Sequence, residues 1–228
     1  MKSAWLQRKI RRFFGPKVRF TTLMRCENMI ISSLTGGSIG TNCYILYQED
    51  TKAAVVIDPG DDAALVKVRI EALGLRVLAI LLTHAHFDHG GDAKKLSAAV
   101  GAPIYAHPAE RELPSWLTHG LSWDRDLSDG ETLDFEGIRL SVLHTPGHTP
   151  GGVCFLCGDA LFAGDTLFAG SCGRTDLPGG SWDEMAASLR RLAALEGNPA
   201  VYPGHGEATT LETERKNNQY MQMALENA

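Results

Sequence analysis

The sequence predicts a turn-rich chain of mixed helices and strands rather than a helical bundle. At 228 residues with 44% hydrophobic content, it is long enough to bury a core as one large domain or two small ones. Its 24 glycines and 10 prolines indicate many turns. Short apolar segments lie between these turn residues, which is typical of strands. We therefore expect a mixed α/β or β-rich fold.

Residues 1–28 are expected to be a basic extension outside the folded domain, which then covers residues 29–228. The extension holds eight basic residues and one acidic residue, a charge of +7, so the rest carries −12 of the total −5. Apolar residues at loosely helical spacing between these bases favour membrane-surface contact or targeting. The same composition is also expected of a disordered tail or of a start codon assigned too early. We adopt this interpretation in place of membrane contact or targeting.

The composition argues against several classes of protein. An acidic body argues against nucleic acid as the main partner, because phosphate binding needs basic patches. No apolar run approaches the roughly 18–20 residues of a membrane span, so no transmembrane segment is expected. Five cysteines are an odd number without a dense framework, which argues against a disulfide-stapled secreted fold. The expected setting is reducing and cytoplasmic.

Strands and helices are expected to follow one another along the domain. Strands are predicted where apolar and β-branched residues fill short segments between turn signals, and helices where apolar residues recur every three or four positions. The predicted strands are Met29–Leu34, Cys43–Tyr47, Ala53–Ile57, Val77–Leu82, Pro103–Ala106, Thr132–Phe135, Ile138–His144, Val153–Leu156, Ala160–Phe162 and Ala200–Tyr202. The predicted helices run from Asp61 or Asp62 to Leu73, from Asp92 to Val100, onward from a capping box of Ser181 and Glu184, and from Leu211 to Leu225.

Residues 107–130 match neither pattern and are expected to be irregular. Such a segment is expected to form one wall of a substrate cleft. Its lone histidines, His107 and His119, are interpreted as surface or packing residues. Cys154 and Cys157 spell a CxxC pair, but a strand places residues three apart on opposite faces, which predicts core packing instead of a shared site.

The stretch Thr83–His89 concentrates three imidazoles and a carboxylate directly after an apolar strand. Because side chains alternate along an extended segment, His84 and His86 are expected to point the same way. Asp88 and His89 then follow in the turn before two glycines. Imidazole and carboxylate ligands suit zinc, iron or manganese. The stretch predicts metal ligands but does not complete a site alone.

Other candidate ligands stand at strand ends or in tight turns elsewhere in the chain. Ligands gathered from several strand ends are how a sheet scaffold preorganises a metal site. Seven ligands without cysteine exceed a closed structural zinc site and predict two metals with open positions that share a carboxylate. The candidates are His84, His86, Asp88, His89, His148, Asp165 and His205. Asp58, at another strand end, is either a carboxylate that orients a metal-bound histidine or a turn residue before a helix.

Five ordered features, covering about Met29 to Tyr220, resemble the metallo-β-lactamase fold superfamily. They are the strand order, Thr83–His89, Gly147–Gly151, Gly164–Thr166 and Pro203–Gly206. Within that superfamily, residues 164–168 followed by 170–176 are similar to the glyoxalase II group of hydroxyacylglutathione hydrolases, nearest to its short bacterial form. The resemblance implies an α+β fold, a four-layer αβ/βα sandwich with two facing sheets.

The resemblance also implies how the ligands divide. His84, His86 and His148 would hold one divalent metal, Asp88, His89 and His205 the other, and Asp165 would bridge them opposite a bridging hydroxide. Zinc is the expected metal, with iron or manganese as alternatives. Asp88 is also the catalytic candidate that receives or relays a proton. Arg174 is either a substrate-binding residue or a loop arginine paired with Asp176.

The activity implied by the resemblance is hydrolysis of a small-molecule thioester, S-lactoylglutathione or another hydroxyacylglutathione. An aspartate at position 165, where metallo-β-lactamases proper often have cysteine, argues against β-lactamase activity. Gln219, where the short form usually has proline, leaves a broader range of thioesters open. The alternatives are a persulfide dioxygenase with a single iron and a lactonase of the same fold. A non-catalytic binding protein would be expected to have lost ligands, and all seven are present.

Overall fold

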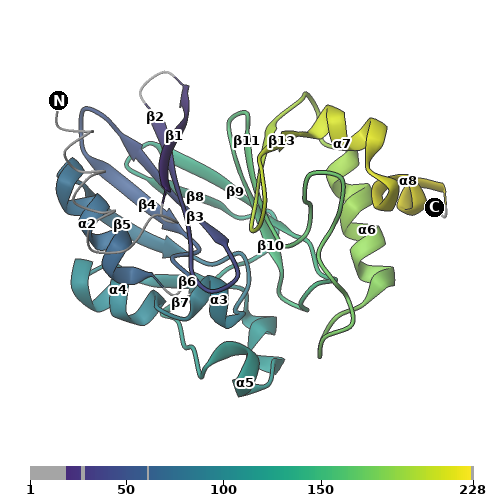
Figure 1. The fold of residues 1–228 in the computed structure, drawn as a ribbon, viewed down its shortest axis with the longest axis horizontal. Coiled ribbons are helices and arrows are strands. Elements are labelled where there is room, and N and C mark those ends of the chain that lie inside the picture. The colour runs from purple at the N-terminus through teal and green to yellow at the C-terminus, as the bar shows by residue number, and fades with distance from the viewer. Residues whose placement is uncertain (1–18, 27–28, 61, 227–228) are drawn as a thin grey trace.

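The protein consists of two mixed β-sheets that face each other, with helices on their outer sides (Figure 1). The computed structural model describes residues 19–26, 29–60 and 62–226. In these residues the first sheet has the strand order β1-β2-β3-β4-β5-β6-β7, and the second has the order β13-β12-β11-β10-β9-β8. Neighbours pair antiparallel except β4 with β5, β5 with β6, β6 with β7, and β11 with β12, which are parallel.

The bounds of the elements follow the predicted strands and helices closely. The first sheet contains β1 (Arg19–Cys26), β2 (Met29–Gly36), β3 (Thr41–Gln48), β4 (Ala53–Ile57), β5 (Arg76–Leu81), β6 (Ile104–Ala106) and β7 (Arg125–Asp126). The second contains β8 (Thr132–Phe135), β9 (Ile138–His144), β10 (Val153–Cys157), β11 (Ala160–Gly164), β12 (Ala200–Pro203) and β13 (Thr209–Thr210). The helices are α2 (Ala63–Leu73), α3 (Phe87–Gly90), α4 (Ala93–Val100), the 3₁₀ helix η1 (Pro108–Glu112), α5 (Ser115–Thr118), α6 (Trp182–Ala193), α7 (Leu211–Asn217) and α8 (Gln219–Glu226).

Three buried apolar clusters separate four layers of secondary structure. One joins the outer face of the first sheet to α2 and α4. The second lies between the two sheets. The third joins the outer face of the second sheet to α6, α7 and α8, which Figure 1 shows on the side opposite α2 and α4. The order is helix, sheet, sheet, helix, so the expected α+β, αβ/βα sandwich is confirmed.

Strict alternation along the strands produces these separate clusters. In β3, Cys43 and Ile45 pack toward the helices, whereas Tyr44 and Leu46 pack between the sheets. The two cysteines of β10 divide in the same way: Cys154 belongs to the cluster beside α6, and Cys157 to the cluster between the sheets. The prediction that this CxxC pair is core packing is therefore confirmed.

Hydrogen bonds tie the two sheets together at one edge. The Asn42 backbone N–H donates to the Gly204 carbonyl at 2.7 Å. The hydroxyl of Tyr44 donates to the Pro203 carbonyl at 2.6 Å, and Nδ2 of Asn42 donates to the same oxygen at 3.1 Å. These bonds join the start of β3 to the end of β12. They fix the position of one sheet relative to the other near the strand ends that carry several candidate ligands.

Three parts of the chain differ from the sequence-based expectations. Arg19–Cys26 was assigned to the extension but forms β1 and pairs with β2, while residues 1–18 lie outside the described residues. Residues 107–130 include η1, α5 and β7 rather than being wholly irregular. The predicted final helix is divided at Asn218, whose ψ of 110° leaves the helical region. Its side-chain oxygen accepts hydrogen bonds from the Tyr220 and Met221 N–H groups and so starts α8.

The helix ends and the lone histidines agree better with expectation. Ser181 caps α6, because its hydroxyl accepts from the Glu184 N–H. His107 stacks on His144 at a ring-centroid distance of 4.2 Å, and His119 stacks on Phe87 at 4.9 Å, both packing contacts. No helix in the described part of the chain is long and apolar enough to cross a membrane.

Candidate metal centre

The first sheet supplies four candidate ligands from one short segment. β5 ends at Leu81, the following loop carries His84 and His86, and the single turn of α3 carries Asp88 and His89. Asp88 and His89 were expected in a turn, which the structure forms as this short helix. All four side chains are buried. The rings of His84 and His86 lie 4.8 Å apart between centroids, as expected for two side chains on one side of an extended segment.

The second sheet supplies three candidate ligands from three separate loops. His148 lies between β9 and β10, Asp165 follows β11, and His205 follows β12. Gly204, just before His205, passes so close to the site that a Cβ there would lie 2.2 Å from Oδ1 of Asp165. It would also lie 2.6 Å from Cε1 of His89, so only glycine fits this position. The close approach brings the end of β12 beside the first sheet's ligands.

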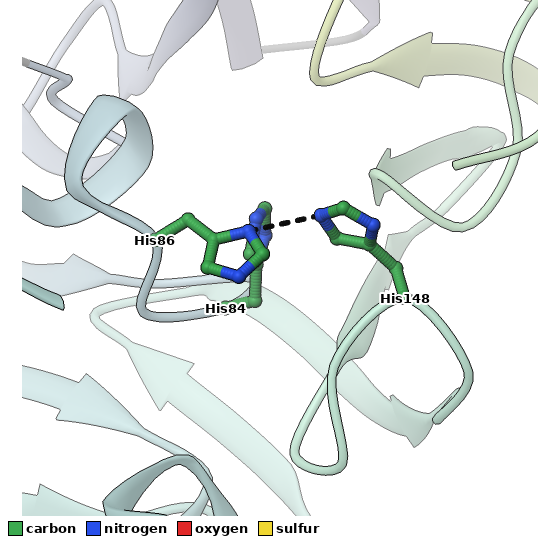
Figure 2. A group of neighbouring side chains, drawn as sticks. All are labelled: His84, His86 and His148. Carbon is green, nitrogen blue, oxygen red and sulfur yellow. Dashed lines mark hydrogen bonds between the residues drawn. The ribbon is translucent and has the colours of Figure 1, made fainter. Parts of the chain in front are cut away.

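One group of ligand atoms consists of three histidines (Figure 2). His84, His86 and His148 each offer a ring nitrogen, and these atoms all lie within 4.8 Å of one another. Nε2 of His148 is 3.0 Å from Nδ1 of His86. Nδ1 of His148 donates to the Arg174 carbonyl at 2.7 Å, so in a neutral ring Nε2 presents a lone pair to His86. The buried Nε2 of His84 has no hydrogen-bond partner.

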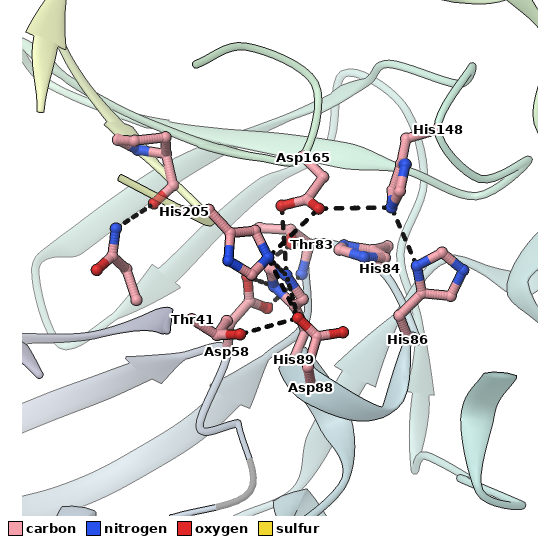
Figure 3. Close-up of polar contacts among 12 residues, drawn as sticks. Thr41, Asp58, Thr83, His84, His86, Asp88, His89, His148, Asp165 and His205 are labelled. Carbon is pink, nitrogen blue, oxygen red and sulfur yellow. Dashed lines mark hydrogen bonds and ion pairs between the residues drawn. The ribbon is translucent and has the colours of Figure 1, made fainter. Parts of the chain in front are cut away.

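The second group combines carboxylates with imidazoles (Figure 3). Oδ2 of Asp88 lies 3.2 Å from Nε2 of His205 and 3.3 Å from Nε2 of His89. Asp165 lies between the two groups: its Oδ1 is 3.3 Å from Nε2 of His89, and its Oδ2 is 3.5 Å from Nε2 of His148. The structure thus brings all seven predicted ligands together.

Neighbouring side chains hold the second group in orientation. Oδ2 of Asp58 is 2.9 Å from Nδ1 of His89, which leaves Nε2 of His89 for the centre. The same carboxylate accepts from the Thr83 N–H and hydroxyl at 2.8 and 2.6 Å. Of the two interpretations open for Asp58, these contacts favour the one that orients a histidine. The hydroxyl of Thr41 donates to Oδ2 of Asp88 at 2.8 Å, a role with no motif in the sequence.

The electrostatics of the two groups fit positively charged ions. Burial, with the nearby His148 and His89, lowers the pKa of His86 to about 4, so its ring is neutral at pH 7. Burial also opposes charge on His89, but Asp165 and Asp58 outweigh it and raise the pKa of His89. The added proton would sit on Nε2, the atom facing Asp88 and Asp165. A positive charge is therefore favoured where a divalent cation would be held, and neutral imidazoles with carboxylates form a suitable donor set.

An open cavity of about 630 Å³ adjoins the centre. The candidate ligands that line it include His86, Asp88 and His205. The rest of its wall is formed mainly by apolar side chains. Two of them, Ile39 and Trp116, are 57% and 60% exposed. The other apolar side chains of the wall are Phe87, Leu117, Phe168 and Leu177.

Arg174 also lines this cavity, although its guanidinium is already engaged. It donates to both carboxylate oxygens of Asp176, at 2.6 and 2.7 Å, and both side chains are exposed. The structure shows the pairing with Asp176, and the substrate-binding role stays a prediction. An exposed ion pair of this kind is weak and can exchange partners with a bound anion.

The sequence of residues 36–205 matches the family model of the metallo-β-lactamase superfamily. The chain belongs to this superfamily. The hydroxyacylglutathione hydrolase GloC of Haemophilus influenzae is 36% identical over 196 residues, covering 79% of this chain and 92% of that protein. The crystal structure of the BLEG-1 B3 metallo-β-lactamase has a TM-score of 0.78 at 38% identity, covering 84% and 99%. A relative crystallised in a di-iron-bound form has a TM-score of 0.72 at 40% identity, covering 82% and 98%.

Proposed function

We propose that the protein is a metal-dependent thioesterase that hydrolyses S-lactoylglutathione or another hydroxyacylglutathione. The observation that carries the proposal is the convergence of seven ligands from both sheets beside an open cavity. The likeness to a hydroxyacylglutathione hydrolase supports the choice of substrate. A small-molecule substrate fits a cavity of about 630 Å³, the size range of ligand pockets.

In this proposal the seven side chains hold two divalent cations. His84, His86 and His148 hold one, and Asp88, His89 and His205 hold the other. Asp165 would bridge them, since its Oδ1 lies near His89 and its Oδ2 lies near both His148 and His205. Two such cations lower the pKa of a shared water molecule toward neutrality and polarise a carbonyl oxygen. Zinc is the proposed metal.

Asp88 has the geometry for proton transfer in addition to its place among the ligands. Its contacts with Thr41, His89 and His205 all involve Oδ2, and its side chain lines the cavity. We assign it the receipt or relay of the proton released when water attacks the thioester carbonyl. The departing thiolate needs little acid assistance because a thiol is a much stronger acid than an alcohol.

Substrate binding is assigned to the apolar walls and to Arg174. Trp116 and Ile39, exposed at the cavity, offer contact area to the acyl or thiol part of a substrate. Arg174 would exchange Asp176 for a substrate carboxylate. This assignment requires a substrate with an anionic group, as glutathione has.

The test combines thioester hydrolysis with metal analysis on one sample of the full chain. We expect release of thiol from S-lactoylglutathione with two metals bound per chain, and loss of that activity on chelation. A β-lactam is a necessary comparison substrate because of the likeness to a B3 metallo-β-lactamase. Faster turnover of the β-lactam, or no thioester turnover with both metals bound, would overturn the proposal.

A persulfide dioxygenase with a single iron is the second candidate. The relative crystallised in a di-iron-bound form, at 40% identity, supports iron as the metal, although that protein holds two irons and not one. The three-histidine group would then suffice for the metal. Oxygen uptake on glutathione persulfide, with one iron per chain and no thioester turnover, would establish this candidate in place of the hydrolase.

A further inference from the structure

Glu110 is a buried carboxylate that contacts the loops of the centre without being one of its candidate ligands. It lies in η1, on the segment between β6 and β7, and only 1% of its surface is exposed. Oε2 accepts a hydrogen bond from the Ala85 N–H at 2.5 Å, and Oε1 accepts one from the Gly151 N–H at 2.8 Å. One side chain therefore holds the backbone of two loops.

These two loops carry the three-histidine group. Ala85 stands between His84 and His86, on the first sheet's side of the site. Gly151 belongs to the loop of His148, on the second sheet's side. Nε2 of His148 and Nδ1 of His86, one from each of these loops, approach to 3.0 Å. The carboxylate thus connects, through backbone, the ligands whose separation decides whether one cation can contact all three.

The local packing restricts position 110 to a carboxylate and position 151 to glycine. A carboxylate offers two acceptor atoms and no donor, which suits two buried backbone N–H groups. A glutamine of the same shape would turn an N–H₂ group toward one of them. A Cβ at Gly151 would lie 2.7 Å from Cγ of Glu110 and 2.8 Å from Oε1, so the loop approaches closely only because position 151 is glycine.

We propose that Glu110 is a positioning residue that sets the distance between His86 and His148 and so tunes the affinity of the three-histidine group for its metal. The inference rests on the proposed metal centre. It predicts a selective effect, because the other group has its own supports, Asp58 behind His89 and Thr41 behind Asp88. A residue that only stabilised the fold would affect both groups alike or neither.

The test is the Glu110→Gln variant, with Glu112→Gln as matched control, because Glu112 is exposed on the same helix. Two zinc dissociation constants are measured by chelator competition in each full-length protein, and ¹H–¹⁵N spectra of the histidine rings show which group fills first. We expect one constant, that of the three-histidine group, to rise about 10-fold or more in Glu110→Gln, the usual scale for losing an outer-sphere partner. Glu112→Gln should leave both unchanged.

A second variant approaches the same contact from the other loop. Gly151→Ala places a methyl group against Glu110 and is expected to weaken the same metal selectively, so it replaces Glu110→Gln if that variant does not fold. Unchanged constants in the folded variant, or equal weakening of both, would overturn the positioning role. A wild-type protein that binds no metal would instead overturn the proposed function. The two failures are therefore distinguishable.

Discussion

The two halves of the molecule contribute to the site in different ways. The first sheet delivers four candidate ligands within residues 84–89, on one loop and one helical turn. The second sheet delivers three, each on its own loop and far apart in the chain: His148, Asp165 and His205. The first set is a local property of one segment. The second is brought together by the strand order of one sheet, and the two sets meet because the two sheets pack against each other.

The ligands of the two halves are held by different kinds of contact, so different substitutions would disturb them. Ligands in the first half are held by nearby side chains such as Asp58, which a substitution can remove. His148 in the second half donates to the backbone carbonyl of Arg174, which no side-chain substitution removes. The relative placement of the halves depends on the contacts between them, including those of Tyr44 with Pro203 and of Glu110 with both loops.

The largest expected effect comes from breaking the connection between the two groups. Asp165→Ala removes the carboxylate that faces both, so we expect loss of at least one metal and a fall in activity greater than the roughly 10–100-fold cost of losing an outer partner. Metal content and thioester turnover measure this. Asp159→Ala, an exposed change in the same hairpin, is the control. Unchanged turnover in Asp165→Ala would refute the bridging role.

The next effect contrasts the orienting partners of the two halves. Asp58→Asn weakens the hold on Nδ1 of His89 and is expected to lower metal affinity or activity about 10–100-fold. Arg174→Ala keeps the backbone carbonyl that holds His148, so metal affinity should stay the same while KM for an anionic thioester rises. Metal dissociation constants and steady-state kinetics distinguish the two. A loss of metal affinity in Arg174→Ala would remove the contrast.

Acid should destabilise the metal-free protein through His86. Its folded-state pKa of about 4 lies below the ordinary value of 6.5, so between these values the unfolded chain binds the proton first. The stability from this group is therefore fully present above pH 6.5 and declines as the pH falls toward 4. Urea unfolding of metal-free protein at pH 7 and pH 5 measures the decline. His86→Asn should show a smaller decline, and an equal one would contradict the assignment.

The smallest expected effect concerns the bonds between the sheets. Tyr44→Phe removes the hydroxyl that donates to the Pro203 carbonyl, while the bonds from Asn42 remain. We expect a loss of about 1 kcal/mol in the free energy of unfolding, typical of one hydrogen bond. Chemical denaturation measures it. A large fall in metal affinity with little change in stability would show that this bond serves the register of the site more than the fold.

Much of the fold followed from patterns that are local in the sequence. The strand from Ala53 to Ile57 has the predicted bounds, because apolar residues between turn signals specify a buried strand directly. The final helix was wrongly expected to be continuous, because its apolar spacing continues across Asn218. Burial of that carboxamide, which also donates to the Ser171 carbonyl, decides the break, and such a long-range contact leaves no local pattern.

The sequence by itself determined the ligand types, the motifs that carry them and the alternation that produces four layers. It also indicated that Asp58 either orients a metal-bound histidine or is a turn residue. Only the tertiary structure decided that Asp165 lies between the two groups, that Thr41 supports Asp88, and that Glu110 joins the loops of His86 and His148. The physical reason is the range of the interactions. Side-chain chemistry and strand periodicity are written in consecutive residues, whereas the distances within the centre depend on how two sheets pack against each other.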